Sequence, residues 1–143
     1  MRILLIILAI AGIVVSSLAL NVHFQTGTQP CDINERWDCG VVNHSSYSML
    51  LGVPVAAIGI AGYVALGLLA FTRHRFFLMV ACLVGFLFAL HLTNIEKNVL
   101  MVWCLYCVIS QCIIALALLL SIGWLIAGIL ARRREEQLAQ KHI

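Results

Sequence analysis

The chain has 143 residues, of which 63% are hydrophobic and only 10% are charged. This composition excludes an ordinary water-soluble domain and is typical of a membrane protein. The formal net charge is +3, without a basic patch interleaved with aromatic residues, so nothing in the sequence indicates nucleic-acid binding. The apolar residues instead form long, nearly uninterrupted blocks.

Four of these blocks are long enough to cross a membrane as helices, which takes about 20 apolar residues each. We expect an all-α membrane protein, a four-transmembrane-helix bundle that forms a single domain over residues 1–143. The predicted spans cover residues 3–22, 53–71, 76–94 and 101–131. The first block also has some features of a signal peptide. It is longer than the usual apolar core of a signal and lacks an A-x-A-like cleavage site, which favours a retained span.

The positions of Lys and Arg predict how the bundle is oriented. If the four spans alternate, one side of the membrane is flanked by Arg2, Arg73, Arg75, Arg132, Arg133 and Arg134. The opposite side carries only Arg36 and Lys97, each beside an acidic residue. Because positive charge is enriched on the cytoplasmic side, we expect both termini there. The loop of residues 23–52 then faces outward, into a compartment where disulfides persist.

The end of this outer loop has an amphipathic pattern. Residues 41–51 are therefore predicted to form a short helix that lies in the membrane interface. Gly52 and Pro54 end this segment and start the second span. Within the segment, Asn43-His44-Ser45 also reads as a glycosylation sequon, although no other feature indicates a eukaryotic source.

Two cysteine pairs carry the chemical signal of the sequence. Cys104 and Cys107 form a C-x-x-C motif at the start of the last span, where a helix N-terminus favours the thiolate. Cys31 and Cys39 lie in the outer loop, on the same predicted side of the membrane. A static disulfide, or a zinc site built from the four thiols, is the structural alternative. Two such pairs at one membrane face favour electron transfer between a soluble thiol partner and a lipid-soluble acceptor.

The order and spacing of these motifs resemble the vitamin K epoxide reductase family. The matching pattern consists of Cys31 and Cys39 separated by seven residues, Ser45, Gly52-Val53-Pro54 before a span, and Cys104-Leu105-Tyr106-Cys107. The resemblance covers nearly the whole chain. Dsb-type quinone oxidases also have four spans and two outer cysteine pairs, but there the C-x-x-C motif precedes the loop pair.

The resemblance implies a role for each cysteine. Cys107 would be the cysteine nearest a membrane quinone, and Cys104 would exchange with Cys39. Cys31 would react with the soluble partner, a DsbA-like protein of the thioredoxin fold. Ser45 matches the family's Ser or Thr, which helps to place the ligand or the exchanging cysteines. The expected electron acceptor is a quinone such as ubiquinone or menaquinone, with no metal.

Gln111 lies one helical turn after Cys107 and could hydrogen-bond either a quinone carbonyl or a neighbouring helix. Vertebrate members of the family have a tyrosine there, so the resemblance supports thiol–quinone exchange rather than epoxide reduction. No thioredoxin-like domain follows the fourth span, so we expect the partner to be a separate chain.

The sequence therefore predicts a quinone-dependent thiol–disulfide oxidoreductase of a bacterial inner (plasma) membrane that supports disulfide formation. The alternative, from another class, is a non-catalytic tetraspan protein with structural disulfides or a zinc site.

Overall fold

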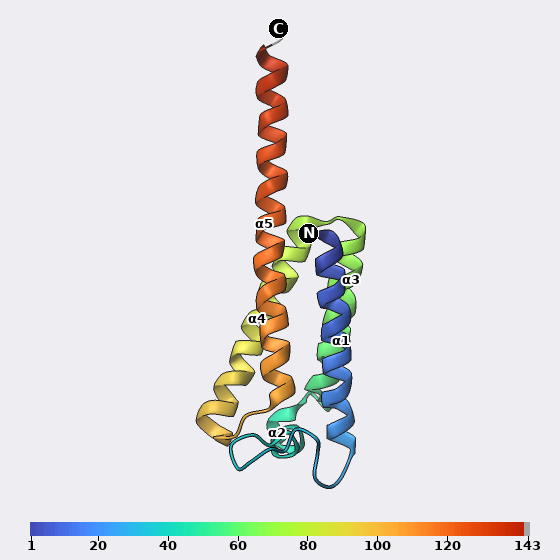
Figure 1. Ribbon diagram of the computed structural model, residues 1–143, viewed down its shortest axis with the longest axis vertical. Coiled ribbons are helices and arrows are strands. Elements are labelled where there is room, and N and C mark those ends of the chain that lie inside the picture. Colours follow the sequence, from blue (N-terminus) through green and yellow to red (C-terminus); the bar gives the residue numbers. More distant parts are fainter. Residues whose placement is uncertain (142–143) are drawn as a thin grey trace.

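Four long helices dominate the computed structural model, which describes residues 1–141 (Figure 1). They are α1 (Arg2–Phe24), α3 (Val55–Thr72), α4 (Arg75–Ile95) and α5 (Leu105–Lys141). Each is long and apolar enough to cross a membrane, which confirms the four helices predicted from the sequence. α1 packs against α3 and α5, and α4 packs against α5.

α3 and α4 meet at a tight turn and diverge from it toward the opposite end of the bundle (Figure 1). The turn is possible because Arg73 adopts a left-handed backbone conformation, with φ of 63°. The N-terminus lies beside this turn, and α5 continues well beyond it to the C-terminus (Figure 1). The guanidinium of Arg2 lies over the ring of Phe71, 5.6 Å from its centroid, which joins the start of α1 to the end of α3.

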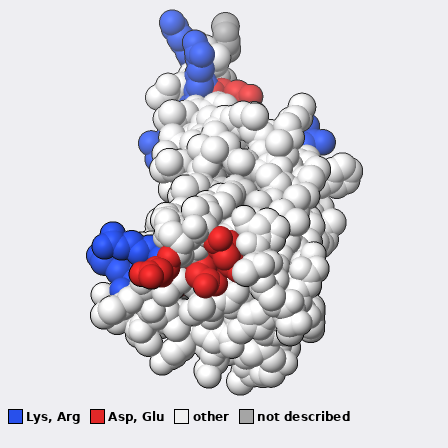
Figure 2. All heavy atoms as spheres, turned by 60° about the horizontal axis from the view of Figure 1, so that its bottom comes forward, with Lys and Arg blue, Asp and Glu red and all other residues white. Residues whose placement is uncertain are grey.

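An uncharged belt surrounds the bundle. Charged side chains gather at two levels, with white surface between them (Figure 2). Large apolar side chains on all four helices are more than half exposed, among them Ile7, Leu68, Val84 and Leu119. Water would penalise such a surface, whereas lipid tails match it, so the belt is what a multi-pass membrane protein requires.

Tyr63 on α3 connects three of the helices. Its side chain is buried, and its ring packs directly on Gly12 of α1, where any added Cβ would overlap the ring atoms. The Tyr63 hydroxyl donates a hydrogen bond to the backbone carbonyl of Ser110 on α5 at 3.0 Å, and it lies 2.8 Å from the Ser110 hydroxyl. Because Gly12 has no side chain, α1 and α3 can approach each other closely.

The outer loop differs from its predicted form. Instead of one helix over residues 41–51, the chain forms α2 (Cys39–His44), the 3₁₀ turn η1 (Ser46–Ser48), and the antiparallel strands β1 (Met49–Leu50) and β2 (Val53–Pro54). Leu51 and Gly52 connect the two strands with positive φ angles of 53° and 81°. This is the backbone of a tight hairpin turn, and a helix cannot contain it.

The fourth helix also begins later than predicted, at Leu105 rather than at residue 101. α4 continues into a π-helical segment, η2 (Glu96–Leu100), and Met101 then turns the chain with φ of 55°. The residues just before Leu105 are not helical because Trp103 pairs with the outer loop, as described below.

We predict that Gly12→Ala destabilises the bundle, because the new methyl group pushes the Tyr63 ring away from α1 and strains its hydrogen bond. Overpacking of this kind costs about 1–3 kcal/mol. The thermal midpoint of the detergent-solubilised protein measures the effect. Gly62→Ala on α3 is the matched control, since a Cβ there meets no atom within 4 Å. Equal midpoints for the two variants would contradict this account of Gly12.

Candidate redox site

Backbone hydrogen bonds join the outer loop to the segment that precedes the C-x-x-C motif. The N–H of Trp103 donates to the carbonyl of Arg36 at 2.8 Å, and the N–H of Asp38 donates to the carbonyl of Trp103 at 3.1 Å. The indole rings of Trp37 and Trp103 add a contact, with centroids 6.3 Å apart. The residue after each paired segment is a cysteine, so this pairing carries Cys39 and Cys104 to the same place.

The structure brings all four predicted site cysteines together. Cys31 and Cys39 are joined by a disulfide, with Cα atoms 5.8 Å apart, and both are buried. They form one hydrophobic cluster with the fully buried Cys104, and the half-buried Cys107 packs against that cluster. Cys104 and Cys107 are free thiols. The outer pair is thus oxidised and the inner pair reduced.

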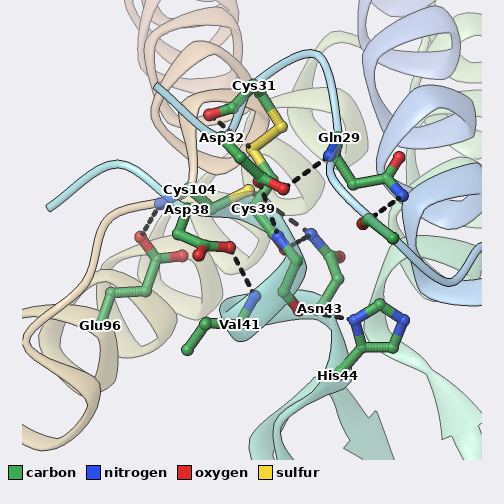
Figure 3. Close-up of a disulfide and its surroundings, with 12 residues drawn as sticks. Gln29, Cys31, Asp32, Asp38, Cys39, Val41, Asn43, His44, Glu96 and Cys104 are labelled. Carbon is green, nitrogen blue, oxygen red and sulfur yellow. Dashed lines mark hydrogen bonds between the residues drawn. A yellow bond between two sulfur atoms is a disulfide. The ribbon is translucent and has the colours of Figure 1, made fainter. Parts of the chain in front are cut away.

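Asn43 of α2 connects the two pairs (Figure 3). Its side chain is buried and donates to the carbonyl of Cys39 at 2.9 Å and to the sulfur of Cys104 at 3.6 Å. The backbone carbonyl of Asn43 accepts a hydrogen bond from the His23 ring of α1, with the nitrogen and oxygen 2.5 Å apart. The amide therefore holds α2 between the cysteines and the outer end of α1, a position that leaves no room for a glycan.

Asp32 ties the two ends of the disulfide loop together (Figure 3). Its carboxylate accepts hydrogen bonds from the backbone N–H of Gln29 at 2.6 Å and of Gly40 at 3.2 Å. Burial acts to raise the pKa of this carboxyl, but hydrogen bonds from the backbone of Gln29, Gly40 and Cys39 and with the Asp38 side chain together outweigh it, and the pKa lies below its ordinary value. The ionised form of Asp32 is the one that stabilises the loop.

Glu96 supports the C-x-x-C motif from the other side. Its carboxyl, at the end of α4, is 3% exposed and accepts a hydrogen bond from the backbone N–H of Cys104 at 3.2 Å. The Cys107 thiol in turn donates a hydrogen bond that lowers the pKa of the Cys104 thiol below its ordinary value, although burial opposes the shift. Cys104 is therefore the more readily ionised sulfur at the junction of the two pairs, as exchange with Cys39 requires.

A cavity of about 610 Å³ opens next to Cys107. Most of its wall is apolar, and α3 and α4, the two helices that diverge from their turn, contribute about half of the residues. Its polar lining near the outer end includes His23, Asn43, Ser45, Glu96 and Cys107. The volume and lining are those of a site for a largely apolar small molecule.

The two other predicted site residues lie in different places. Ser45 lines the cavity, and its hydroxyl donates to the carbonyl of Val42 at 2.7 Å, which closes the end of α2. Gln111 is not part of the cavity wall; its side-chain oxygen accepts a hydrogen bond from the hydroxyl of Thr93 on α4 at 3.2 Å. Thr93 does line the cavity, so Gln111 contacts a residue of the cavity wall without lining the cavity itself.

Sequence reasoning missed Asn43 and Glu96 as members of this site. Glu96 carried a usable signal, since it is an acidic residue between an apolar span and a C-x-x-C motif, but it was interpreted only as a neighbour of Lys97. Asn43 carried no such signal, because its contacts depend on how the loop folds back. Among residues 1–141 there is no group of three or more His, Cys, Asp or Glu side chains that could hold a metal ion.

The fold and the site together define a class, namely a multi-pass membrane protein with a disulfide and a vicinal dithiol in contact at one end of a helix bundle. A model of the vitamin K epoxide reductase family matches residues 3–122, and the chain belongs to this family. Members of the family are generally thiol–disulfide oxidoreductases that work with quinones and thioredoxin-like proteins. A search of curated proteins found no match.

We predict that Asp32→Asn loosens the disulfide loop at neutral pH, because an amide is a weaker acceptor for the N–H groups of Gln29 and Gly40 than a carboxylate. A carboxyl whose pKa is lowered by folding stabilises the protein above its unfolded pKa, near 3.8. That contribution disappears as the pH falls through the lower, folded-state pKa.

The rate at which a protease cleaves the outer loop, measured from neutral to acidic pH, tests this prediction. Wild type should be cut more slowly than Asp32→Asn at neutral pH, and the difference should shrink in acid. Glu35→Gln is the control, since Glu35 lies in the same loop and is exposed. A difference that persists unchanged at low pH would refute the assigned role of the ionised carboxylate.

Proposed function

We propose that the protein oxidises the dithiol of an extracytoplasmic, DsbA-like protein of the thioredoxin fold and passes the two electrons to a membrane quinone. The electrons travel through Cys31 and Cys39, and then through Cys104 and Cys107. The observation that carries the proposal is the packing of both pairs into one buried cluster, with Cys107 on the wall of an apolar cavity.

Each step is a dithiol–disulfide exchange until the quinone is reached. The partner's dithiol reduces the Cys31–Cys39 disulfide and leaves with a disulfide of its own. Cys39 then attacks the oxidised C-x-x-C motif at Cys104, which releases Cys107 as a thiolate, and Cys31 displaces Cys104 to restore the outer disulfide. At the end of these steps the outer pair is again a disulfide and the inner pair is a dithiol.

A quinone is the acceptor that the cavity fits best. When bound, it accepts two electrons and two protons and becomes a quinol. The apolar walls from α3 and α4 suit its ring and the start of its chain, and Val84 on the α4 wall is also among the largely exposed apolar side chains of the belt. The Ser45 hydroxyl would turn from the Val42 carbonyl to donate a hydrogen bond to a carbonyl of the ring, and Gln111 would act indirectly, by orienting Thr93.

The proposed setting is a bacterial inner membrane, with both termini in the cytoplasm and the cysteines on the outer face. The support is the charge distribution: the six arginines named from the sequence flank the end opposite the cysteine loop. Exchange with a partner protein also requires the outer loop to open, since Cys31 is only 2% exposed in the closed state.

A static disulfide is the second candidate, and the complete burial of Cys39 favours it. In that case Cys31 and Cys39 would hold the loop closed and would not exchange. The two predictions below separate the candidates.

We predict that Cys107→Ala reduces quinone turnover to the protein-free background, because it removes the sulfur on the cavity wall. The measurement is quinol formation by the membrane-reconstituted protein with a small dithiol as electron donor. Cys112→Ala is the matched control, since Cys112 is exposed on the same helix and should keep wild-type turnover. Wild-type turnover by Cys107→Ala would rule out the relay.

We also predict that the double variant Cys31→Ala/Cys107→Ala traps a Cys39–Cys104 disulfide under mild oxidation. Each remaining thiol has lost its partner within its own pair, and the two lie in one cluster. Peptide mapping by mass spectrometry detects the link, and addition of Cys39→Ala should abolish it. Free thiols, or a bond from Cys39 to Cys82 or Cys112, would favour the static disulfide instead.

A further inference from the structure

One buried acid at the site has no role in the relay described so far. Glu96 is the residue at which α4 passes into η2, and only 3% of it is exposed. Its carboxyl accepts a hydrogen bond from the N–H of Cys104 (Figure 3). The carboxyl also lies within hydrogen-bond reach of the Cys107 thiol. It also lines the cavity together with Cys107.

The N–H contact alone does not explain a glutamate at this position. A glutamine would accept the same hydrogen bond from Cys104, and burying a neutral amide costs less free energy than burying a carboxylate. What a carboxyl adds is the ability to take up and release a proton. It has this ability next to a thiol that must lose its proton whenever the pair is oxidised.

Building on the proposed function, we propose that Glu96 carries the proton of Cys107 to the quinone. The Cys107 S–H bond breaks and a Glu96 O–H bond forms, which makes the sulfur a thiolate. Cys104 and Cys107 then join in a disulfide, and their two electrons reduce the quinone. Glu96 returns to a carboxylate by giving its proton to one quinone oxygen, and the proton of Cys104 goes to the other. Two thiols and a quinone thus become a disulfide and a quinol, with no proton left over.

The surroundings leave Glu96 as the group best placed for this transfer. The other titratable groups that face it are Cys104 and Cys107 themselves, while His23 of α1 lies elsewhere on the cavity wall, bonded to the Asn43 carbonyl. Lys97, its neighbour in η2, is exposed. Two tyrosines, Tyr63 and Tyr106, also line the cavity, but Glu96 is the carboxyl that shares this wall with Cys107.

Two variants of Glu96 separate proton transfer from a purely structural role. Glu96→Gln keeps the hydrogen-bond acceptor for Cys104 but cannot carry a proton, whereas Glu96→Asp keeps the acid but is one methylene shorter. The measurement is a single turnover, in which the protein in lipid nanodiscs is reduced beforehand and mixed rapidly with a short-chain quinone.

For a proton carrier, we expect the rate to fall about 100-fold in Glu96→Gln at neutral pH, as for the loss of other general acid–base groups. Glu96→Asp should keep more of the rate than Glu96→Gln. The rate of Glu96→Gln should also rise with pH, because hydroxide takes over the removal of the thiol proton. The control Glu35→Gln removes an exposed acid and should match wild type in rate and pH profile.

The opposite order of the two rates, with Glu96→Gln faster than Glu96→Asp, overturns the inference. If Glu96→Gln matches wild type while Glu96→Asp is slow, the residue serves only as an acceptor for the Cys104 N–H. A wild-type protein that forms no quinol would instead refute the proposed function, and the inference with it.

An infrared difference spectrum between the reduced and the diamide-oxidised protein provides a test without quinone, and it remains usable if one variant fails to fold. Because Glu96 is a carboxylate before and after the transfer, the two end states differ in the hydrogen bond from the Cys107 thiol, which only the reduced protein can donate. A carrier therefore requires a carboxylate band that shifts on oxidation of the C-x-x-C motif in wild type and in Glu35→Gln and that is missing in Glu96→Gln. A wild-type spectrum without a carboxyl change would overturn the inference.

Discussion

The site depends on a very short stretch of backbone pairing. Two hydrogen bonds, between Trp103 and the flanking residues Arg36 and Asp38, attach the outer loop to the segment before α5. Each pair of cysteines is local in sequence, but the two pairs are more than sixty residues apart. Closing so long a segment costs conformational entropy. Packing of the bundle already brings the ends of α1, α4 and α5 together, which reduces that entropy cost. The pairing then sets the register between the outer loop and the segment before α5.

This arrangement also explains why the outer loop is polar and yet folded. Its polar groups have partners: Asp32 accepts hydrogen bonds from two backbone N–H groups, and the buried Asn43 reaches both Cys39 and Cys104. From the end of α4, the buried Glu96 accepts a hydrogen bond from the N–H of Cys104. Unpaired groups in such a place would each cost about 1–3 kcal/mol. The same side chains that hold the loop in place therefore also determine the polarity around the sulfurs.

The direction in which electrons pass between the two cysteine pairs depends on the difference between their reduction potentials. For a two-electron couple, about 30 mV between the pairs corresponds to 1.4 kcal/mol, so modest differences in thiol environment suffice to direct the flow. The hydrogen bond between the Cys107 and Cys104 thiols is one such difference, since it lowers the pKa of Cys104.

The sequence by itself determined the four helices, since uninterrupted apolar blocks of sufficient length have few alternatives in a membrane. It also determined the family, because the order and spacing of the cysteine pairs are local features that need no knowledge of packing. It predicted the helix over residues 41–51 only in part, because the positive φ angles at Leu51 and Gly52 were not recognised as a hairpin turn.

Only the tertiary structure decided which polar side chains join the cysteines. In the sequence, Asn43 was interpreted as part of a sequon and Glu96 only as the acidic neighbour of Lys97, yet both are buried against Cys104. Gln111, one turn from Cys107 in sequence, bonds Thr93 behind the cavity wall. The physical reason is that helical periodicity says which residues share a face, whereas the cavity arises from the divergence of α3 and α4. Packing of the whole bundle sets that divergence, and no local pattern encodes it.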